Sequence, residues 1–438
     1  MSTEAKGGLR PRVRDGILQA LRAGVTPRYG LQHLQVGRLR EVETLLEDIE
    51  RIADGGAAIR FIVGEYGSGK SFFLQLIRSI ALEKGAVCLH ADLAPDRRLH
   101  ASGGQARMLY AELLRNCSTR SKPEGGALGS MVERFIAEVR RHAGEAGMSV
   151  EQCIEERLHE LSESVGGYDF ARVIAAYWQG YERGCEQLRD EALRWLRGEF
   201  STRTEARKSL GVGSIVDDGN VYDRLKLLAR FVRRAGYAGL LVCIDELVNL
   251  YKLPQRQTRL ANYEQILRML NDCLQGSAEH LGFLFGGTPE VLFDTGKGLF
   301  SYEALRSRLE ENNFARRAGV VDYAAPVLRL ANLTPEELYL LLCNVRLVHA
   351  NGDPGASSVP DEALDAFVHH CSRHIGDAYF RTPRNTVKAF VDFLSVLDQH
   401  PDLQWSQLLG MVRIEADAPS DMPGNVDEDD DALADFRL

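Results

Sequence analysis

The stretch that most constrains this chain is a glycine-rich loop set between an apolar run and a helical pattern. Its sequence, Gly64-Glu65-Tyr66-Gly67-Ser68-Gly69-Lys70-Ser71, matches the phosphate-binding P-loop pattern G-x-x-x-x-G-K-[ST] in full. The apolar residues 59–63 predict a buried strand before the loop, and the apolar positions from Phe72 to Ile80 predict a helix after it. Because backbone N–H groups of such a loop and the positive end of the helix face the same anion, the order of these parts predicts a nucleotide site.

Two loop residues have specific expected roles. Lys70 is placed to reach the β- and γ-phosphates of ATP, and the Ser71 hydroxyl is placed to ligate Mg²⁺. We therefore expect ATP and Mg²⁺ as cofactors. The residues of this segment expected to contact the nucleotide are Gly64, Glu65, Tyr66, Gly67, Ser68, Gly69, Lys70, Ser71 and Phe72.

A second apolar run, residues 240–244, ends in two acids that complete such a site. Asp245 is expected to hold the Mg²⁺ shell, and Glu246 to orient or deprotonate the attacking water. Two acids after an apolar strand are common by chance, but the P-loop upstream favours the catalytic interpretation. A further apolar run, residues 281–285, leads to Thr288 at the carboxyl edge of the predicted sheet, where ligands of open parallel sheets bind.

The composition is that of a globular chain. Its 438 residues suggest two to four domains, with 45% hydrophobic and 26% charged residues. No apolar run approaches the ~20 residues that span a bilayer, and residues 1–8 have no apolar core typical of a signal peptide. We therefore expect a cytoplasmic protein without a membrane partner. The eight cysteines lie far apart without zinc spacing, so we expect reduced thiols and no structural metal.

The net charge of −9 is concentrated at one end of the chain. Residues 415–438 carry −8, so the other 414 residues carry about −1 and could hold a local basic face for DNA. Three arginine pairs are candidate phosphate contacts, although such pairs more often form solvated faces. These pairs are Arg140-Arg141, Arg233-Arg234 and Arg316-Arg317. No helix-turn-helix or zinc module is recognisable, so DNA is an expected partner on weak grounds.

The spacing of the motifs indicates the domain organisation. Lys70 and Asp245 are 175 residues apart, far more than a strand and two helices need, so we expect a helical insertion over about 101–220. The apolar and aromatic positions of residues 170–181 in that insertion fit a core-facing helix better than a base-stacking platform. Thr334 and Glu337 predict a capping box at the start of a later helical unit. The expected parts are an N-terminal arm 1–30, a P-loop domain 31–325, a helical lid 326–413 and a flexible acidic tail 414–438.

Several of these motifs together resemble the AAA+ ATPases of the origin-recognition and related archaeal-type group. The resemblance rests on the P-loop, Asp245-Glu246, Thr288, Val36-Gly37-Arg38, residues 304–309 and Arg381-Thr382-Pro383-Arg384. It implies an α/β fold with a parallel sheet, a large helical insertion and a C-terminal helical lid, with a winged-helix-like lid as an alternative. It also implies a homo-oligomer whose sites are completed by a neighbouring subunit.

The resemblance further implies roles for individual residues. Val36, Gly37 and Arg38 would pack near the adenine, Thr288 would be a first sensor and Arg384 a second sensor on the lid. Either Arg306 or Arg308 would reach the γ-phosphate of a neighbouring subunit, with Arg316 and Arg317 as competitors in the same region. An arginine supplied in trans would couple hydrolysis to assembly through its charge.

More narrowly, the order of parts resembles the BrxD-type ATP-binding proteins of BREX phage-defence systems. The likeness covers nearly the whole chain and includes the long insertion, the Arg381–Arg384 segment and the C-terminal Phe436-Arg437-Leu438. It implies a bacterial cytosol and an operon with a helicase-like protein, a DNA methyltransferase and a phosphatase-like protein. The partners expected from it are other defence-system proteins, such as the helicase-like one.

Three functions remain open from the sequence. The first is a Mg²⁺-dependent ATPase that assembles through its nucleotide sites and acts on DNA or loads a partner onto it. The second is a slow nucleotide switch that binds a protein partner, and the third is a sensor ATPase that assembles on protein. Glu246 favours an ATPase, because a pure switch needs no acid that orients water.

Overall fold

The computed structural model describes residues 8–357, 359–375 and 383–411. These form two compact units. The larger unit comprises Thr26–Glu65 and Gly69–Asn332, and the smaller unit comprises residues up to Val25, Tyr66–Ser68 and residues from Leu333 onward. The domain bounds expected from the sequence stay predictions, and the acidic tail 414–438 lies outside the described residues.

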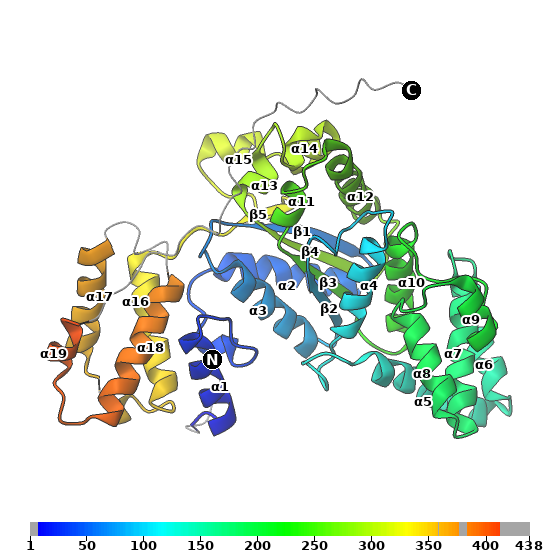
Figure 1. The fold of residues 1–438 in the computed structure, drawn as a ribbon, viewed down its shortest axis with the longest axis horizontal. Helices are drawn as coiled ribbons and strands as arrows, with labels where there is room; N and C mark the ends of the chain where they lie inside the picture. Colours follow the sequence, from blue (N-terminus) through cyan, green and yellow to red (C-terminus); the bar gives the residue numbers. More distant parts are fainter. Residues whose placement is uncertain (1–7, 358, 376–382, 412–438) are drawn as a thin grey trace, which may run out of the picture. The chain divides into compact units, whose positions relative to one another are not determined.

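The larger unit is built on a five-stranded, fully parallel sheet with the strand order β2-β3-β4-β1-β5 (Figure 1). Its strands are β1 (Ala57–Val63), β2 (Val87–Asp92), β3 (Leu240–Asp245), β4 (Leu281–Gly287) and β5 (Val327–Arg329). The α/β class with a parallel sheet is therefore confirmed. Because β1, β3 and β4 are neighbours, the segments that follow them meet at one edge of the sheet.

The strands β1 to β4 follow the apolar runs of the sequence, since both faces of a parallel sheet are covered and nearly every position is buried. The edge strand β5 was not expected. It has three residues, of which only Leu328 is fully buried, so its sequence has no recognisable period.

Helices cover both faces of the sheet. On one face, α2 (Leu39–Ala53) and α3 (Lys70–Glu83) pack against it through one apolar cluster (Figure 1). On the other face lie α4 (Gln105–Arg115), α10 (Val221–Arg234) and α12 (Arg256–Gln275). A buried ion pair connects α2 to β1. Arg60 Nε lies 2.5 Å and Nη2 3.0 Å from the two carboxylate oxygens of Asp48.

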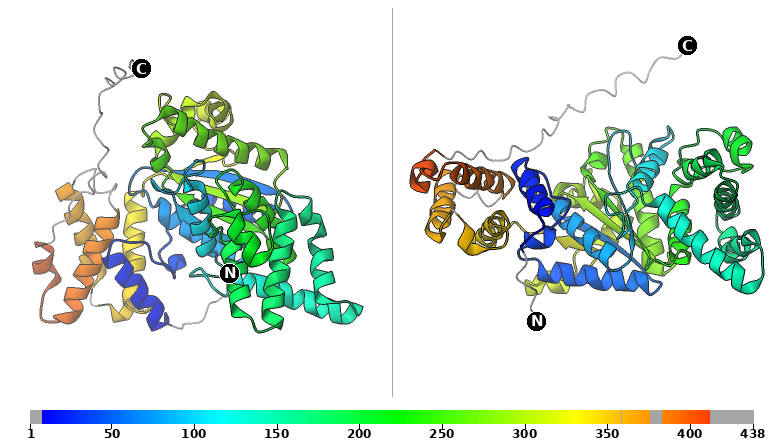
Figure 2. Two further views of the ribbon diagram at one scale, coloured as in Figure 1. Left: turned by 45° about the vertical axis from the view of Figure 1, so that its right-hand side comes forward. Right: turned by 90° about the horizontal axis from the view of Figure 1, so that it is seen from below.

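The helices that follow α4 and precede α10 in the sequence pack against one another at one side of the larger unit (Figure 2). They are α5 (Leu128–Ala146), α6 (Val150–Ser162), α7 (Gly167–Glu182), α8 (Glu186–Leu196) and α9 (Arg203–Leu210). The apolar stripe of α7 faces the core as predicted, with Phe170, Tyr177 and Trp178 buried. Its last member, Tyr181, is 49% exposed.

Short helices follow β3 and β4 in the larger unit. They are α11 (Val248–Tyr251), α13 (Pro289–Phe293), α14 (Glu303–Leu309) and α15 (Asn313–Ala318). Single 3₁₀ turns lie at Leu31–His33 and Leu299–Ser301. No helix among the described residues is long and apolar enough to span a bilayer.

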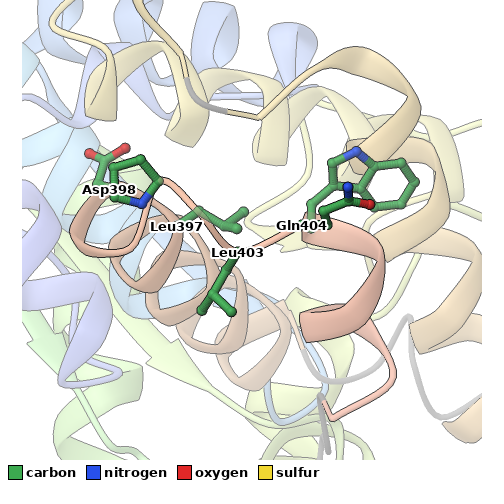
Figure 3. A pocket seen from close by; sticks show the side chains of 6 residues that line it. Leu397, Asp398, Leu403 and Gln404 are labelled. Atoms are coloured by element: carbon green, nitrogen blue, oxygen red, sulfur yellow. The ribbon is translucent and has the colours of Figure 1, made fainter.

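The smaller unit is helical over its described residues. Its helices are α1 (Pro11–Arg22), α16 (Pro335–His349), α17 (Asp361–Ile375), α18 (Pro383–Gln399) and α19 (Trp405–Leu409), with a 3₁₀ turn at Pro354–Ala356. The predicted capping box of α16 is confirmed, since Thr334 and Glu337 each bind the other's backbone N–H. A cavity of about 310 Å³ opens beside the turn from α18 to α19, where Leu397 and Leu403 line it (Figure 3).

Candidate functional site

The P-loop joins β1 to α3 as the sequence predicts. Gly67 and Gly69 have φ angles of 81° and 82°, a left-handed conformation that glycine adopts without strain. Gly69 caps α3, so Lys70 is the first residue of the helix. Lys70 Nζ donates to the carbonyl oxygens of Gly64 at 2.8 Å and Glu65 at 2.9 Å. The lysine is thereby held along the loop that would surround a triphosphate.

The hydroxyl of Ser71 and the carboxylate of Asp245 are in direct contact. Ser71 Oγ donates to Asp245 Oδ2 at 2.9 Å, although the two residues are 174 positions apart. The start of α3 and the end of β3 bring them together at the same sheet edge. Both residues expected to ligate the metal therefore lie side by side.

These donors fit a magnesium ion. Mg²⁺ prefers hard oxygen ligands, and a hydroxyl with one carboxylate leaves positions for waters and phosphate oxygens. Gly286 of β4 makes room for the carboxylate, because a Cβ at this position would overlap Asp245 Oδ1. Sequence reasoning missed the role of Gly286, since only the neighbouring strand explains why it lacks a side chain.

Glu246 has an unusual backbone. Its φ angle is 60°, a left-handed value that is uncommon outside glycine. Its N–H donates to Asp245 Oδ1 at 2.8 Å, which fixes the sharp bend at the end of β3. Burial raises the pKa of the Glu246 carboxyl, the charges of Asp245 and Asp92 raise it further, and Lys70 lowers it. The side chain is thus a carboxyl of enhanced basicity beside the metal ligands.

Asp92 is a third acid at this edge and was not predicted. It ends β2 and pairs in register with Asp245. Burial raises its pKa, and Asp245 raises it further. The sequence did carry a signal for it, because β2, like β3, is an apolar run that ends in an aspartate.

The negative charges of these acids act on the ammonium group of Lys70. Burial lowers its pKa, and the charges of Asp245, Glu246, Glu65 and Glu290 oppose this shift. Glu290, in α13, was also missed by sequence reasoning. Thr288, two residues earlier, occupies the N-cap position of α13 directly after β4 but makes no side-chain capping hydrogen bond there. The strand β4 lies between β1 and β3 in the sheet, and the sensor role of Thr288 stays a prediction.

The Val36-Gly37-Arg38 segment leads into α2. Gly37 and Arg38 both have left-handed φ angles, of 62° and 59°. Arg38 Nη2 donates to the carbonyl oxygen of Ala331 at 2.9 Å, which connects this segment to the chain just after β5. Contact with adenine stays a prediction for all three residues.

The candidate finger arginines have partners in their own chain. Arg306 pairs with Glu310 at 3.8 Å, and Arg308 Nε donates to Asn271 Oδ1 at 2.8 Å. Both lie on α14 and are partly or fully exposed, so neither is locked in a core. Their action on a neighbouring subunit stays a prediction.

The candidate second sensor belongs to the smaller unit. Arg384 lies in the first turn of α18, where its Nη1 is 3.4 Å from the hydroxyl oxygen of Tyr66, a residue of the same unit. Arg381 and Thr382 of the motif lie outside the described residues.

Comparison with known proteins identifies the family. The family model described as BREX system ATP-binding protein BrxC/D matches residues 9–413, which include the P-loop, Asp245 and Glu246. No curated protein matches the chain. The family match confirms the resemblance to BREX ATP-binding proteins noted from the sequence, and it agrees with a nucleotide site built from β1, α3 and β3. The chain therefore belongs to the BrxC/D family of BREX system ATP-binding proteins.

Proposed function

We propose that this chain is a Mg²⁺-dependent ATPase of a BREX phage-defence system. The observation that carries the proposal is the hydrogen bond between Ser71 and Asp245, with Glu246 as the next residue. A protein that binds a nucleotide without hydrolysing it needs the lysine and the metal ligands. It does not need a carboxyl of raised pKa on a strained backbone beside them, which Glu246 provides.

Each residue has a part in this reaction. Lys70 and the loop N–H groups bind the phosphates, while Ser71 and Asp245 hold Mg²⁺, which neutralises charge on the phosphate oxygens. Glu246 accepts the proton of the attacking water, for which its raised pKa suits it. Thr288 is proposed to sense the γ-phosphate from the end of β4, and Val36, Gly37 and Arg38 to contact adenine.

We further propose an AAA+ assembly in the cytoplasm. Arg306 or Arg308 of one subunit would contact the γ-phosphate bound by its neighbour, and Arg384 would act as the second sensor of a helical lid. The support is that both α14 arginines carry exposed side chains with weak or neutral partners. An arginine of this kind can exchange its partner for a phosphate at small cost.

DNA is the proposed partner of the ATPase cycle, either directly or through a helicase-like protein that the chain loads. The arginine pairs give this only modest support, because several of their members already have partners. Arg141 pairs with Glu138 and Glu145, and Arg234 pairs with Glu160. A slow switch that binds a protein partner is therefore the second candidate function.

Steady-state ATP hydrolysis in Mg²⁺, with and without duplex DNA, tests the proposal. We expect turnover by the wild-type protein and at least a hundredfold loss in Lys70→Ala, because the lysine contacts the transferred phosphate. Unchanged hydrolysis in Lys70→Ala would refute the site. Stimulation by DNA that weakens steeply with salt supports action on DNA. Tight ATP binding with near-zero turnover under all conditions would instead favour the switch.

A further inference from the structure

A second cavity, lined by charged as well as apolar side chains, adjoins the candidate metal ligands. It has a volume of about 190 Å³ and lies between α3, the ends of β2 and β3, and the segment Thr26–Arg28, all within the larger unit. One side of α3 lines it at the helical spacing of residues 71, 74, 75 and 78. Because Ser71 and Asp245 are among the lining residues, the cavity opens onto the proposed Mg²⁺ position.

The cavity contains a buried cation without an acidic partner. Arg78 is 7% exposed, and its buried Nε has no hydrogen-bond partner. Its Nη2 makes one long contact of 3.5 Å to the carbonyl oxygen of Pro123. Within the described residues, no carboxylate lies within ion-pair distance of its guanidinium. Burial lowers the pKa of Arg78, and the titratable groups that act on it are two buried thiols and Arg28. A buried charge of this kind costs several kcal/mol unless a counter-ion compensates it.

The other groups at this end of the cavity do not supply that counter-ion. Arg28 adds a second guanidinium, whose side chain is 79% exposed and forms a surface ion pair with Glu124 at 3.3 Å, a contact that it can exchange for a phosphate at small cost. Burial and the charge of Arg78 lower the pKa of His90 to about 4, so this imidazole is neutral at pH 7, and its buried Nδ1 has no partner. Gln75 contributes an amide that can donate.

The opposite end of the cavity is acidic. Asp92 and Asp245 line it beside Ser71, and of these Ser71 and Asp245 are the groups expected to ligate Mg²⁺. The cavity thus offers a metal-ligating end and a cationic end with donors. A volume of 190 Å³ accommodates a small tetrahedral anion with a few waters, since a water occupies ~30 Å³ in the liquid.

We propose that this cavity binds inorganic phosphate, with Arg78 and Arg28 as its ligands. The identification of this anion as the product of the site rests on the proposed ATPase function. Hydrolysis at the Ser71–Asp245 end would release phosphate next to the cavity, and the guanidinium groups would draw it away from the P-loop. Arginine suits this task because its planar fork binds phosphate oxygens in pairs.

Equilibrium binding of radiolabelled orthophosphate, in Mg²⁺ and without nucleotide, tests this proposal. We expect Lys70→Ala to retain phosphate binding at the cavity, because it removes the P-loop lysine and leaves both cavity guanidinium groups in place. We expect Arg78→Gln to bind at least tenfold more weakly than the wild type, and Arg78→Lys to fall between these two because it keeps the charge. Arg28→Gln, an exposed change that leaves the core intact, should weaken binding severalfold.

Two results would overturn the proposal. One is the absence of phosphate binding by the wild type at millimolar concentration. The other is binding that Lys70→Ala abolishes and Arg78→Gln retains, which would put the phosphate in the P-loop. ATP binding by Arg78→Gln serves as the folding control. If phosphate binds through Arg78 while the wild type does not hydrolyse ATP, the cavity assignment stands and the proposed ATPase function fails.

Discussion

At the scale of single residues, the site depends on where three acids lie at one sheet edge. Asp92 and Asp245 both raise the pKa of Glu246. A base acts only when it is deprotonated, so turnover should be high above this raised pKa and fall as pH decreases through it. The acidic limb of the kcat profile should therefore lie above the range of an ordinary glutamate.

Asp92→Asn provides the test of this interaction. Removing one neighbouring negative charge lowers the pKa of Glu246, so the acidic limb should move to lower pH while turnover at pH 8 stays within about threefold. The kcat–pH profile of the variant measures the shift. A limb that stays in place would show that Glu246 is not the titrating base.

Glu246→Gln addresses the same residue directly. The amide cannot accept a proton, so we expect turnover to fall by about 10²-fold or more, with ATP binding unchanged. Single-turnover hydrolysis and nucleotide titration measure the two effects. Retained turnover would contradict the role of Glu246 as the base.

ATP turnover should be as sensitive to substitution of Gly286 as to substitution of a charged residue of the site. Because a Cβ there would overlap the Asp245 carboxylate, Gly286→Ala should displace a metal ligand and reduce turnover at least tenfold. Gly213→Ala is the matched control, since its Cβ would meet nothing within 4 Å. Equal activity of the two variants would show that the carboxylate can move without loss.

At the scale of elements, the ion pair between α2 and β1 positions the strand that leads into the P-loop. Arg60 also donates to the carbonyl oxygens of Tyr323 at 3.0 Å and Ala325 at 2.6 Å, so it joins three segments. Arg60→Leu leaves the buried Asp48 with the exposed Arg51, 3.2 Å from its Oδ1, as its remaining ion-pair partner among the described residues. We expect the change to lower the free energy of unfolding by up to about 3–5 kcal/mol.

The double variant Asp48→Leu/Arg60→Leu is the control for that change. Removing both charges should recover much of the lost stability, because no carboxylate is then buried without its arginine partner and its desolvation cost is removed. Urea unfolding followed by circular dichroism compares the three proteins. A double variant less stable than Arg60→Leu would contradict this account.

The elements themselves were largely predictable, and the exceptions have physical causes. Buried parallel strands read as apolar runs, and the capping box of α16 is a local signal, so both were found. The strand β5 is too short to show a period. The roles proposed for Gly286, Asp92 and Arg78 depend on neighbours distant in sequence, and no local pattern encodes such contacts.

At the scale of the whole molecule, the proposed finger arginines make activity a property of an assembly. Arg306→Ala or Arg308→Ala should lower turnover at least tenfold without preventing ATP binding. Mixing the correct finger variant with Lys70→Ala should restore part of the activity, since each can complete the other's site. Turnover measured over a range of mixing ratios tests this, and a lack of restoration would favour a site complete in one subunit.

The most direct test of the central claim is a double-mutant cycle on ATP turnover with Ser71→Ala, Asp245→Asn and the double variant. If the two side chains ligate one metal, either single change removes most of the ATP turnover. The turnover of the double variant should then be little lower than that of the less active single variant. Losses that multiply in the double variant would show two independent roles and contradict the shared site.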